Sequence, residues 1–171
     1  INMLATGNTI NECHILNMCA LNTTFPRIPS ETISRETYLD LIDQQFAENK
    51  VLCVSGQKGA GVTMTLAMFA MRHSMECVSY FNYGLSRMEL SSKTIEDCLT
   101  KQLMLYIDGD VSKYEEINMR SIMYKALRRA KSQHRYIYFV IDGFATVPAD
   151  SKEILRDILA PWFSNENIRF L

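Results

Sequence analysis

The apolar positions of this chain fall into two kinds of run that alternate along it. Short runs rich in β-branched and aromatic residues predict buried strands at 50–55, 77–81, 136–141 and 168–171. Between them, apolar residues recur three and four positions apart, which predicts helices at 30–48, 62–73, 94–107, 113–131 and 152–159. This alternation predicts an α/β fold with a mostly parallel sheet and right-handed crossovers.

The first 29 residues differ in composition from the rest of the chain. Asn and Thr are frequent there, and Pro26 and Pro29 close the stretch, which is typical of an extended connector. We therefore predict a linker at 1–29 and an α/β core at 30–171. Ser30, Thr32 and Ser34 are alternative caps for the first helix. Because the last strand starts only at Ile168, we expect the core to be incomplete at its C-terminal end.

Composition and charge exclude several classes of protein. The chain has 171 residues, of which 47% are hydrophobic, and a net charge of −1, as in a soluble globular domain. It has neither a signal-peptide pattern nor an apolar run long enough to span a membrane. The basic run at 128–131 suits a solvated helix C-terminus, so we expect no nucleic-acid partner for this segment. Five cysteines without a C-x-x-C pair, Cys53 and Cys77 among them, suit reduced, packed thiols in a cytoplasmic protein.

The stretch VSGQKGAGVTMT, at 54–65, lies between a predicted strand and a predicted helix. The phosphate-binding loop is written G-x-x-x-x-G-K-[ST], and Gly56, Gly61 and Thr63 occupy its glycine and hydroxyl positions. Val62 stands where the lysine belongs. Backbone N–H groups of such a loop, together with the helix N-terminus behind it, suit a phosphate chain.

A second feature lies at the end of the apolar run YIYFVI, where Asp142 follows directly. Phosphate-loop NTPases hold Mg²⁺ with a carboxylate in this position. Either feature alone is typical of an ordinary turn, but their order and their placement on strands favour a nucleotide site. The candidate Mg²⁺ ligands are Thr63 and Asp142. The candidate nucleotide-binding residues of the loop are Gly56, Gln57, Lys58, Gly59, Ala60, Gly61, Val62 and Thr63.

These motifs resemble the core of a STAND-type NTPase, the class that includes the NACHT proteins. VLCVSGQKGAGVTMTLAMFA resembles the Walker A strand, loop and helix, YIYFVIDGF resembles the Walker B strand, and NIRFL resembles the strand after it. The segment from Pro29 to Glu36 resembles the proline-containing "R-E" stretch that helps to enclose adenine, which adds Arg35 to the candidate nucleotide-binding residues. The resemblance implies a three-layer P-loop NTPase fold, truncated before the C-terminal helical subdomains, that binds ATP or ADP with Mg²⁺.

The departures from this class bear on activity. The Walker A lysine neutralises charge on the transferred phosphate, and Val62 cannot do so. Lys58 is a candidate substitute, and the alternative is an ordinary solvated loop lysine. Related NTPases often continue D-G-L-D-E, whereas this chain has Ala145 and Thr146 at the acidic positions. Asp150 lies beyond Pro148, and we interpret it as a helix cap.

These losses predict a site that holds a nucleotide with little hydrolysis, in which Asp142 would be the catalytic residue if activity remains. The resemblance implies a switch or oligomerisation module that self-associates and shares its full-length chain with effector and sensor domains, in immune signalling or antiviral defence. One alternative is an active ATPase that uses Lys58, Thr63 and Asp142. Another is a protein-interaction domain on a relic fold that binds no nucleotide.

Overall fold

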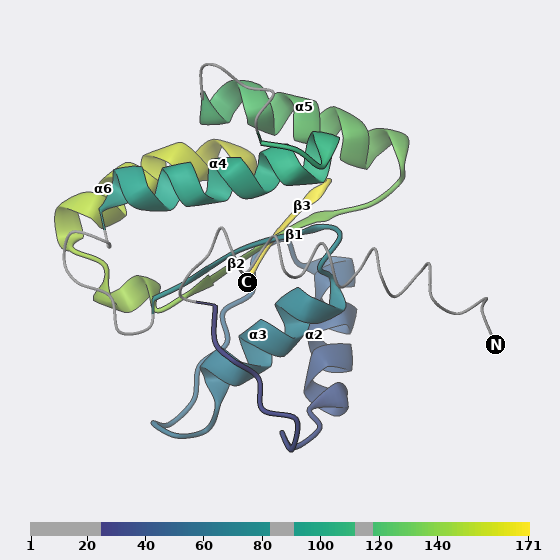
Figure 1. The fold of residues 1–171 in the computed structure, drawn as a ribbon, viewed down its shortest axis with the longest axis vertical. Coiled ribbons are helices and arrows are strands. Elements are labelled where there is room, and N and C mark those ends of the chain that lie inside the picture. The colour runs from purple at the N-terminus through teal and green to yellow at the C-terminus, as the bar shows by residue number, and fades with distance from the viewer. Residues whose placement is uncertain (1–24, 83–90, 112–117) are drawn as a thin grey trace.

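The computed structural model describes residues 25–82, 91–111 and 118–171 (Figure 1). Its helices and strands are α2 (Glu36–Glu48), α3 (Val62–Arg72), β1 (Cys77–Phe81), α4 (Ser92–Asp108), α5 (Met119–Ser132), β2 (Ile137–Asp142), α6 (Ala149–Leu159) and β3 (Ile168–Phe170). Short 3-10 turns occupy Phe144–Thr146 and Ala160–Trp162. The predicted alternation is confirmed for the strands at 77–81, 136–141 and 168–171, whereas the strand predicted at 50–55 is reduced to a bridge at Val51. Most of the predicted linker and the start of the helix predicted at 113 lie outside the described residues.

All pairings between the strands of the sheet are parallel. Its order is β1-β2-β3, with Phe81 opposite Asp142 and Ile137 opposite Ile168. Residues 51–54, here called the edge segment, lie along the other side of β3. Val51 forms a bridge with Phe170, and the N–H of Leu52 donates to the carbonyl of Phe170 at 2.8 Å. The carboxyl ends of β1, β2 and the edge segment therefore meet at the same end of the sheet.

Helices cover both faces of the sheet (Figure 1). The helices α2 and α3 lie on one face, and α4, α5 and α6 lie on the other. Each side has its own apolar cluster, and the neighbouring residues Phe139 and Val140 of β2 enter opposite ones. A strand buried on both faces reads as a continuous apolar run, which is why 136–141 is so clearly a strand in the sequence. The α/β fold with a parallel sheet is confirmed.

The strand predicted at 50–55 is not buried on both faces. Val51 is 52% exposed and Cys53 is also exposed, whereas Leu52 and Val54, which alternate with them, pack against the apolar cluster on the side of α2 and α3. The prediction of packed thiols is therefore wrong for Cys53. It is confirmed for Cys77 and Cys98, which are buried, and burial raises the pKa of both thiols. These two side chains remain protonated and behave as small apolar groups.

The predicted helix caps are also corrected. The helix α2 follows Arg35 and has no side-chain cap, and the hydroxyl of Thr32 donates to the carbonyl of Pro29 at 2.6 Å instead. Pro148 occupies the N-cap position of α6, and Asp150 lies in the first turn without a capping hydrogen bond. There its carboxylate still interacts favourably with the helix dipole.

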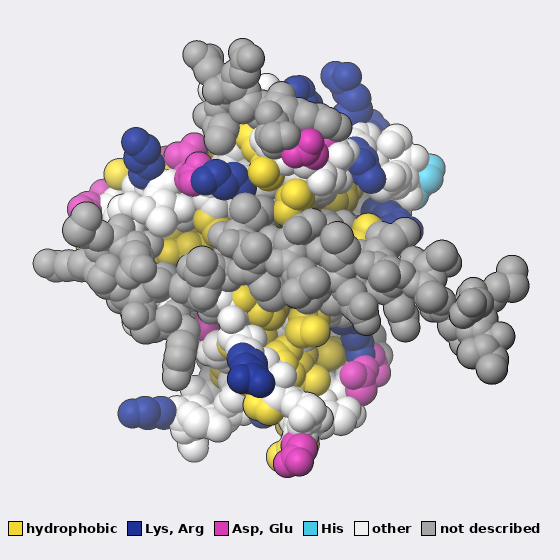
Figure 2. Space-filling model, viewed as in Figure 1, with side chains coloured by type: hydrophobic (Ala, Val, Ile, Leu, Met, Phe, Trp, Pro, Cys, Tyr) yellow, Lys and Arg dark blue, Asp and Glu magenta, His cyan; other side chains and the backbone are white. Residues whose placement is uncertain are grey.

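The basic run lies where the sequence predicts it. Arg129 and Lys131 belong to the last turn of α5, and Figure 2 shows Lys and Arg side chains gathered at this corner of the molecule. The Arg129 guanidinium donates to the carbonyl of Ile107. Among the helices that the structure describes, none combines the length and apolar character needed to cross a bilayer.

The outer edge of β1 is closed by a side chain. Gln102 of α4 accepts a hydrogen bond from the N–H of Ser79 at 2.8 Å and donates to the carbonyl of Ser79 at 2.7 Å. Its amide thus pairs with the strand as another peptide group would. Gln102 and Ser79 are both almost fully buried, so water does not replace these bonds.

We expect Gln102→Leu to lower the free energy of unfolding by about 2–4 kcal/mol, because it removes both hydrogen bonds from a buried peptide group. Urea unfolding monitored by circular dichroism gives this value, provided that the denaturant dependence is unchanged. Gln44→Leu is the matched control, since Gln44 is exposed on α2 and its replacement should change stability by less than about 0.5 kcal/mol. Equal losses in the two variants would contradict the closure of this edge by Gln102.

Candidate functional site

Residues 56–61, here called the glycine loop, connect the edge segment to α3. The N–H of Ala60 donates to the carbonyl of Gln57 at 3.0 Å, which closes a turn. Gly59 and Gly61 have φ angles of +88° and +80°. Glycine adopts this left-handed region without strain, whereas other residues do not. Two of the glycines predicted to bind phosphate are therefore needed for the loop conformation itself.

The start of α3 is not capped by any side chain. Gly61 is the N-cap residue and carries no side chain that could accept a hydrogen bond. The first turn, from Val62 to Met64, leaves backbone N–H groups without intrahelical acceptors. Together with the helix dipole, these groups place positive partial charge beside the glycine loop. The loop residues Gln57 and Lys58 are exposed, so an anion could reach this end of the helix.

Thr63 and Asp142 meet beside the glycine loop. The Thr63 hydroxyl donates to Oδ2 of Asp142 at 2.7 Å, although the two residues are 79 positions apart in sequence. Thr63 belongs to the first turn of α3 and Asp142 is the last residue of β2, and both are half-buried. A hydroxyl and a carboxylate beside an anion site suit Mg²⁺, which takes its other ligands from water and phosphate.

These two residues do not form a complete metal site on their own. Within 25–82, 91–111 and 118–171, no group of three or more His, Cys, Asp or Glu side chains could hold a metal ion. A divalent cation at Thr63 and Asp142 would therefore depend on oxygen atoms of a bound ligand. This pair fits a cation that arrives with a phosphate ligand better than a permanently bound metal.

Val62 and Lys58 differ in where they lie. A Cβ built on Gly56 would lie 3.0 Å from Cγ2 of Val62, so the valine side chain lies across the loop toward Gly56. It contributes packing there but no charge. Lys58 is exposed and makes no hydrogen bond or ion pair with the residues that the structure describes. Its service as a substitute lysine stays a prediction.

Arg35 reaches the glycine loop from the start of α2. Its Nη1 donates to the carbonyl of Ala60 at 3.3 Å and to the hydroxyl of Thr65 at 3.2 Å. Its Nη2 lies so close to Gly61 that a Cβ on that residue would overlap it. The structure therefore brings Arg35 together with the loop residues Ala60 and Gly61, as the sequence predicts for one nucleotide site.

Sequence reasoning missed Asn82, which follows β1 directly. Its side-chain amide donates to the carbonyl of Gly143 at 3.2 Å and also contacts the hydroxyl of Thr146. This contact holds the turn after β2 beside the end of β1. The sequence does contain a signal for Asn82, since it is a polar side chain directly after a buried strand. The carboxyl ends of neighbouring parallel strands lie together, so such a residue is expected close to the turn after β2.

The turn after β2 contains no group that could act as a base. The Thr146 hydroxyl donates to the carbonyl of Gly143 at 2.8 Å, and the carbonyl of Ala145 accepts from Lys152 at 2.5 Å. Asp150 is exposed on α6. The acids expected in an active NTPase are therefore not replaced by another carboxylate within this turn.

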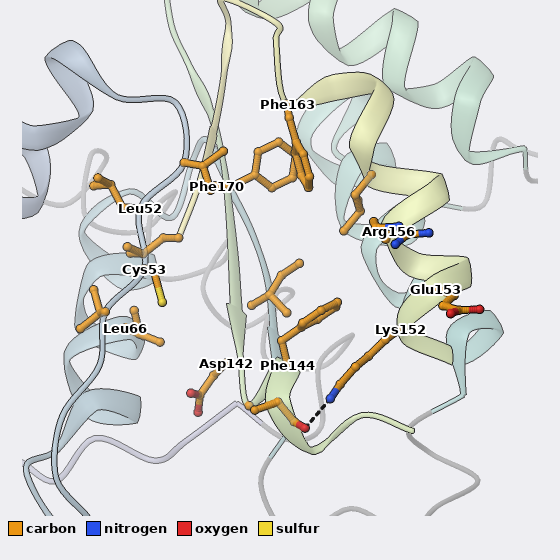
Figure 3. A pocket seen from close by; sticks show the side chains of 17 residues that line it. Leu52, Cys53, Leu66, Asp142, Phe144, Lys152, Glu153, Arg156, Phe163 and Phe170 are labelled. Carbon is orange, nitrogen blue, oxygen red and sulfur yellow. Dashed lines mark hydrogen bonds between the residues drawn. The ribbon is translucent and has the colours of Figure 1, made fainter. Parts of the chain in front are cut away.

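A cavity of about 550 Å³ opens between the edge segment, the end of β2 and α6 (Figure 3). Leu52, Leu66 and Phe163 give it a mostly apolar wall, and Lys152 and Arg156 line its α6 side. Asp142 lines one end, but its carboxylate points away from Lys152 (Figure 3). Residues of the glycine loop do not line this cavity, which reaches the candidate site at the start of α3 only through Asp142.

We expect Gly61→Ala to destabilise the chain more than Gly59→Ala. Both positions have a left-handed backbone, so each alanine should cost about 1–2 kcal/mol. Only the Cβ at position 61 also collides with the Arg35 guanidinium, whereas the one at position 59 has open space around it. Thermal unfolding of the two variants measures the difference.

Arg35→Ala provides the control for this collision. In the Arg35→Ala background, the additional cost of Gly61→Ala should shrink toward that of Gly59→Ala, which a double-mutant cycle quantifies. If the two glycine variants lost equal stability, the packing of Arg35 against Gly61 would be wrong.

Comparison with family models, with curated proteins and with solved structures finds no match to this chain. Function must therefore come from the residues of the chain and from their geometry. Four features of the chain indicate what it could bind: the glycine loop, the uncapped start of α3, the hydrogen bond between Thr63 and Asp142, and Arg35.

Proposed function

We propose that this chain is a nucleotide-binding module of the P-loop type, similar to the STAND class, that holds ATP or ADP and cleaves it poorly. The hydrogen bond between Thr63 and Asp142 is the observation that carries this proposal. In the motif, these two residue types serve one Mg²⁺–phosphate unit. Their contact here is what that role requires, because two residues that share a cation must lie together.

The sheet topology supports the same function. The edge segment and β2 lie on either side of β3, and both run in the same direction. The glycine loop after the edge segment and the turn after β2 therefore leave the same end of the sheet. Ligands of open α/β sheets bind at this end. A three-layer P-loop fold belongs to this proposal, and its helices on both faces are compatible with the observed arrangement.

Cleavage is expected to be slow for two independent reasons. Val62 places no positive charge at the start of α3, and Ala145 and Thr146 provide no base after β2. Losing one group that stabilises transition-state charge typically costs about 10²–10³-fold in rate. Binding depends less on these positions, because the backbone N–H groups of the loop and the hydroxyl of Thr63 remain.

A site that binds a nucleotide without rapid cleavage suits a switch or an oligomerisation module. In this proposal the module self-associates and responds to effector and sensor domains of the same full-length chain, within a cytoplasmic signalling or defence protein. That wider role rests on the resemblance to STAND proteins alone. The nucleotide site itself can be tested without knowing the trigger.

The first measurement is isothermal calorimetry of the wild-type chain with ATP·Mg²⁺ and with ADP. We expect binding of both, and we expect Val62→Lys to bind ATP about 10- to 150-fold more tightly, because it restores a charged hydrogen bond to phosphate. Gln44→Lys is the matched control, since it adds the same charge at an exposed position of α2 outside the glycine loop and should change the affinity far less.

Two results would contradict this proposal, and each would favour a different alternative function. No heat from either nucleotide at millimolar concentration, in the wild type and in Val62→Lys, would favour an interaction domain that binds no nucleotide. Sustained phosphate release that is lost in Asp142→Ala would favour an active ATPase that uses an unusual lysine.

A further inference from the structure

The charge of Arg35 is not balanced within the described part of the chain. No carboxylate there forms an ion pair with it, and its two Nη1 hydrogen bonds go to the neutral oxygens of Ala60 and Thr65. Its Nε is buried and has no partner among the described residues. The neighbouring Glu36 pairs with Arg72 instead.

The position of this cation is unfavourable in the absence of an anion. Arg35 contacts Gly61, the N-cap of α3, where the helix dipole already contributes positive charge. Lys58 adds another cation to the same loop. Asp142, the carboxylate of the candidate site, accepts the hydrogen bond of Thr63. It forms no ion pair with Arg35 or Lys58 in the described residues. Three sources of positive charge thus meet at the glycine loop, and the described chain supplies little to neutralise them.

We infer that Arg35 places a positive charge beside the phosphate chain of the ligand, in place of the lysine that Val62 replaces. The ligand class is then a nucleoside di- or triphosphate that is recognised chiefly by its phosphates. This inference rests on the proposed function. It assigns Arg35 to the phosphate end, whereas the resemblance to STAND proteins implies a position beside adenine. The geometry that favours the phosphate end is the contact of the guanidinium with Ala60 and Gly61, within the glycine loop itself.

Arg35 is also able to exchange its present partners for a phosphate. Its hydrogen bond to the carbonyl of Ala60 measures 3.3 Å, which is long for an N–H···O bond, so breaking it costs little. A guanidinium has five N–H donors in one plane and binds phosphate through two of them at once. Lys58, whose ammonium group is a point charge without a planar fork, lacks this geometry.

The test compares ligands that differ in their phosphates on the full chain. ATP·Mg²⁺, ADP, pyrophosphate and adenosine are each measured with the wild type, Arg35→Gln and Arg128→Gln, by displacement of a fluorescent ATP analogue. We expect Arg35→Gln to weaken the binding of ATP, ADP and pyrophosphate about ten-fold or more and to leave that of adenosine unchanged. Arg128→Gln is the matched control, since it removes the same charge from an exposed position of α5 on the other face of the sheet, and it should have a much smaller effect on all four ligands.

A second variant separates charge from loop structure. If Arg35 acts through its charge, Val62→Lys in the Arg35→Gln background should restore most of the lost ATP affinity, because the new ammonium starts from the same loop. Thermal unfolding of both variants shows whether they are folded. If Arg35→Gln does not fold, Arg35→Lys, which keeps the charge without the planar fork, replaces it and should lose less affinity for phosphate ligands than Arg35→Ala.

The outcomes distinguish this inference from the proposed function. Wild-type chain that binds none of the nucleotides overturns the proposed function and this inference with it. Wild-type chain that binds ATP, with Arg35→Gln unchanged or with adenosine weakened as much as ATP, overturns only the role of Arg35. A folded Arg35→Gln variant whose ATP affinity is not restored by Val62→Lys overturns it as well, since the arginine would then act by shaping the loop.

Discussion

The parallel pairing of β2 with its two neighbours is the constraint on which the rest of the molecule depends. Its register places Phe81 opposite Asp142 and Phe139 opposite Phe170, so every strand leaves the sheet at the same end. If β2 ran in the opposite direction, Asp142 would lie at the far end from the glycine loop and could not reach Thr63. The same pairing sends alternate side chains of β2 into two apolar clusters, which holds helices on both faces.

Much of this fold follows from the sequence because buried strands and amphipathic helices leave distinct patterns. The runs at 77–81 and 136–141 are apolar apart from Ser79, as expected for strands with both faces covered by helices. The run at 50–55 has the same appearance, yet Val51 and Cys53 are exposed. Burial of an apolar run depends on elements that pack beside it, and one segment of sequence does not contain that information. The predicted start of the first helix was wrong for a related reason. Ser30, Thr32 and Ser34 are equally suitable caps in the sequence, but the helix begins after Arg35.

Some features of the candidate site can likewise be predicted from the sequence, and others depend on how distant elements pack. The glycines at 59 and 61 follow from the local turn, and the meeting of Thr63 with Asp142 follows from motif order on parallel strands. The contacts of Arg35 do not, because they depend on how α2 packs on α3. Arg72 of α3 supports that packing by pairing with three carboxylates of α2, those of Glu36, Asp40 and Asp43. Partial burial of Arg72 lowers its pKa, but the three carboxylates outweigh this effect and raise it.

The groups suited to binding come from three separate elements, and this bears on how a switch could work. Arg35 belongs to the start of α2, Thr63 to α3 and Asp142 to β2. Two hydrogen bonds of 3.3 Å and 3.2 Å join Arg35 to the loop and to α3, and one of 2.7 Å joins Thr63 to Asp142. A phosphate ligand that takes over such bonds would change how firmly α2 and β2 are held to the start of α3. Only a ligand with different affinities for two arrangements of these elements can shift the balance between them, and the effect is reciprocal. ATP and ADP differ by one phosphate, so under the proposed function a charged residue at the loop, rather than a contact with the base, is the group suited to telling them apart.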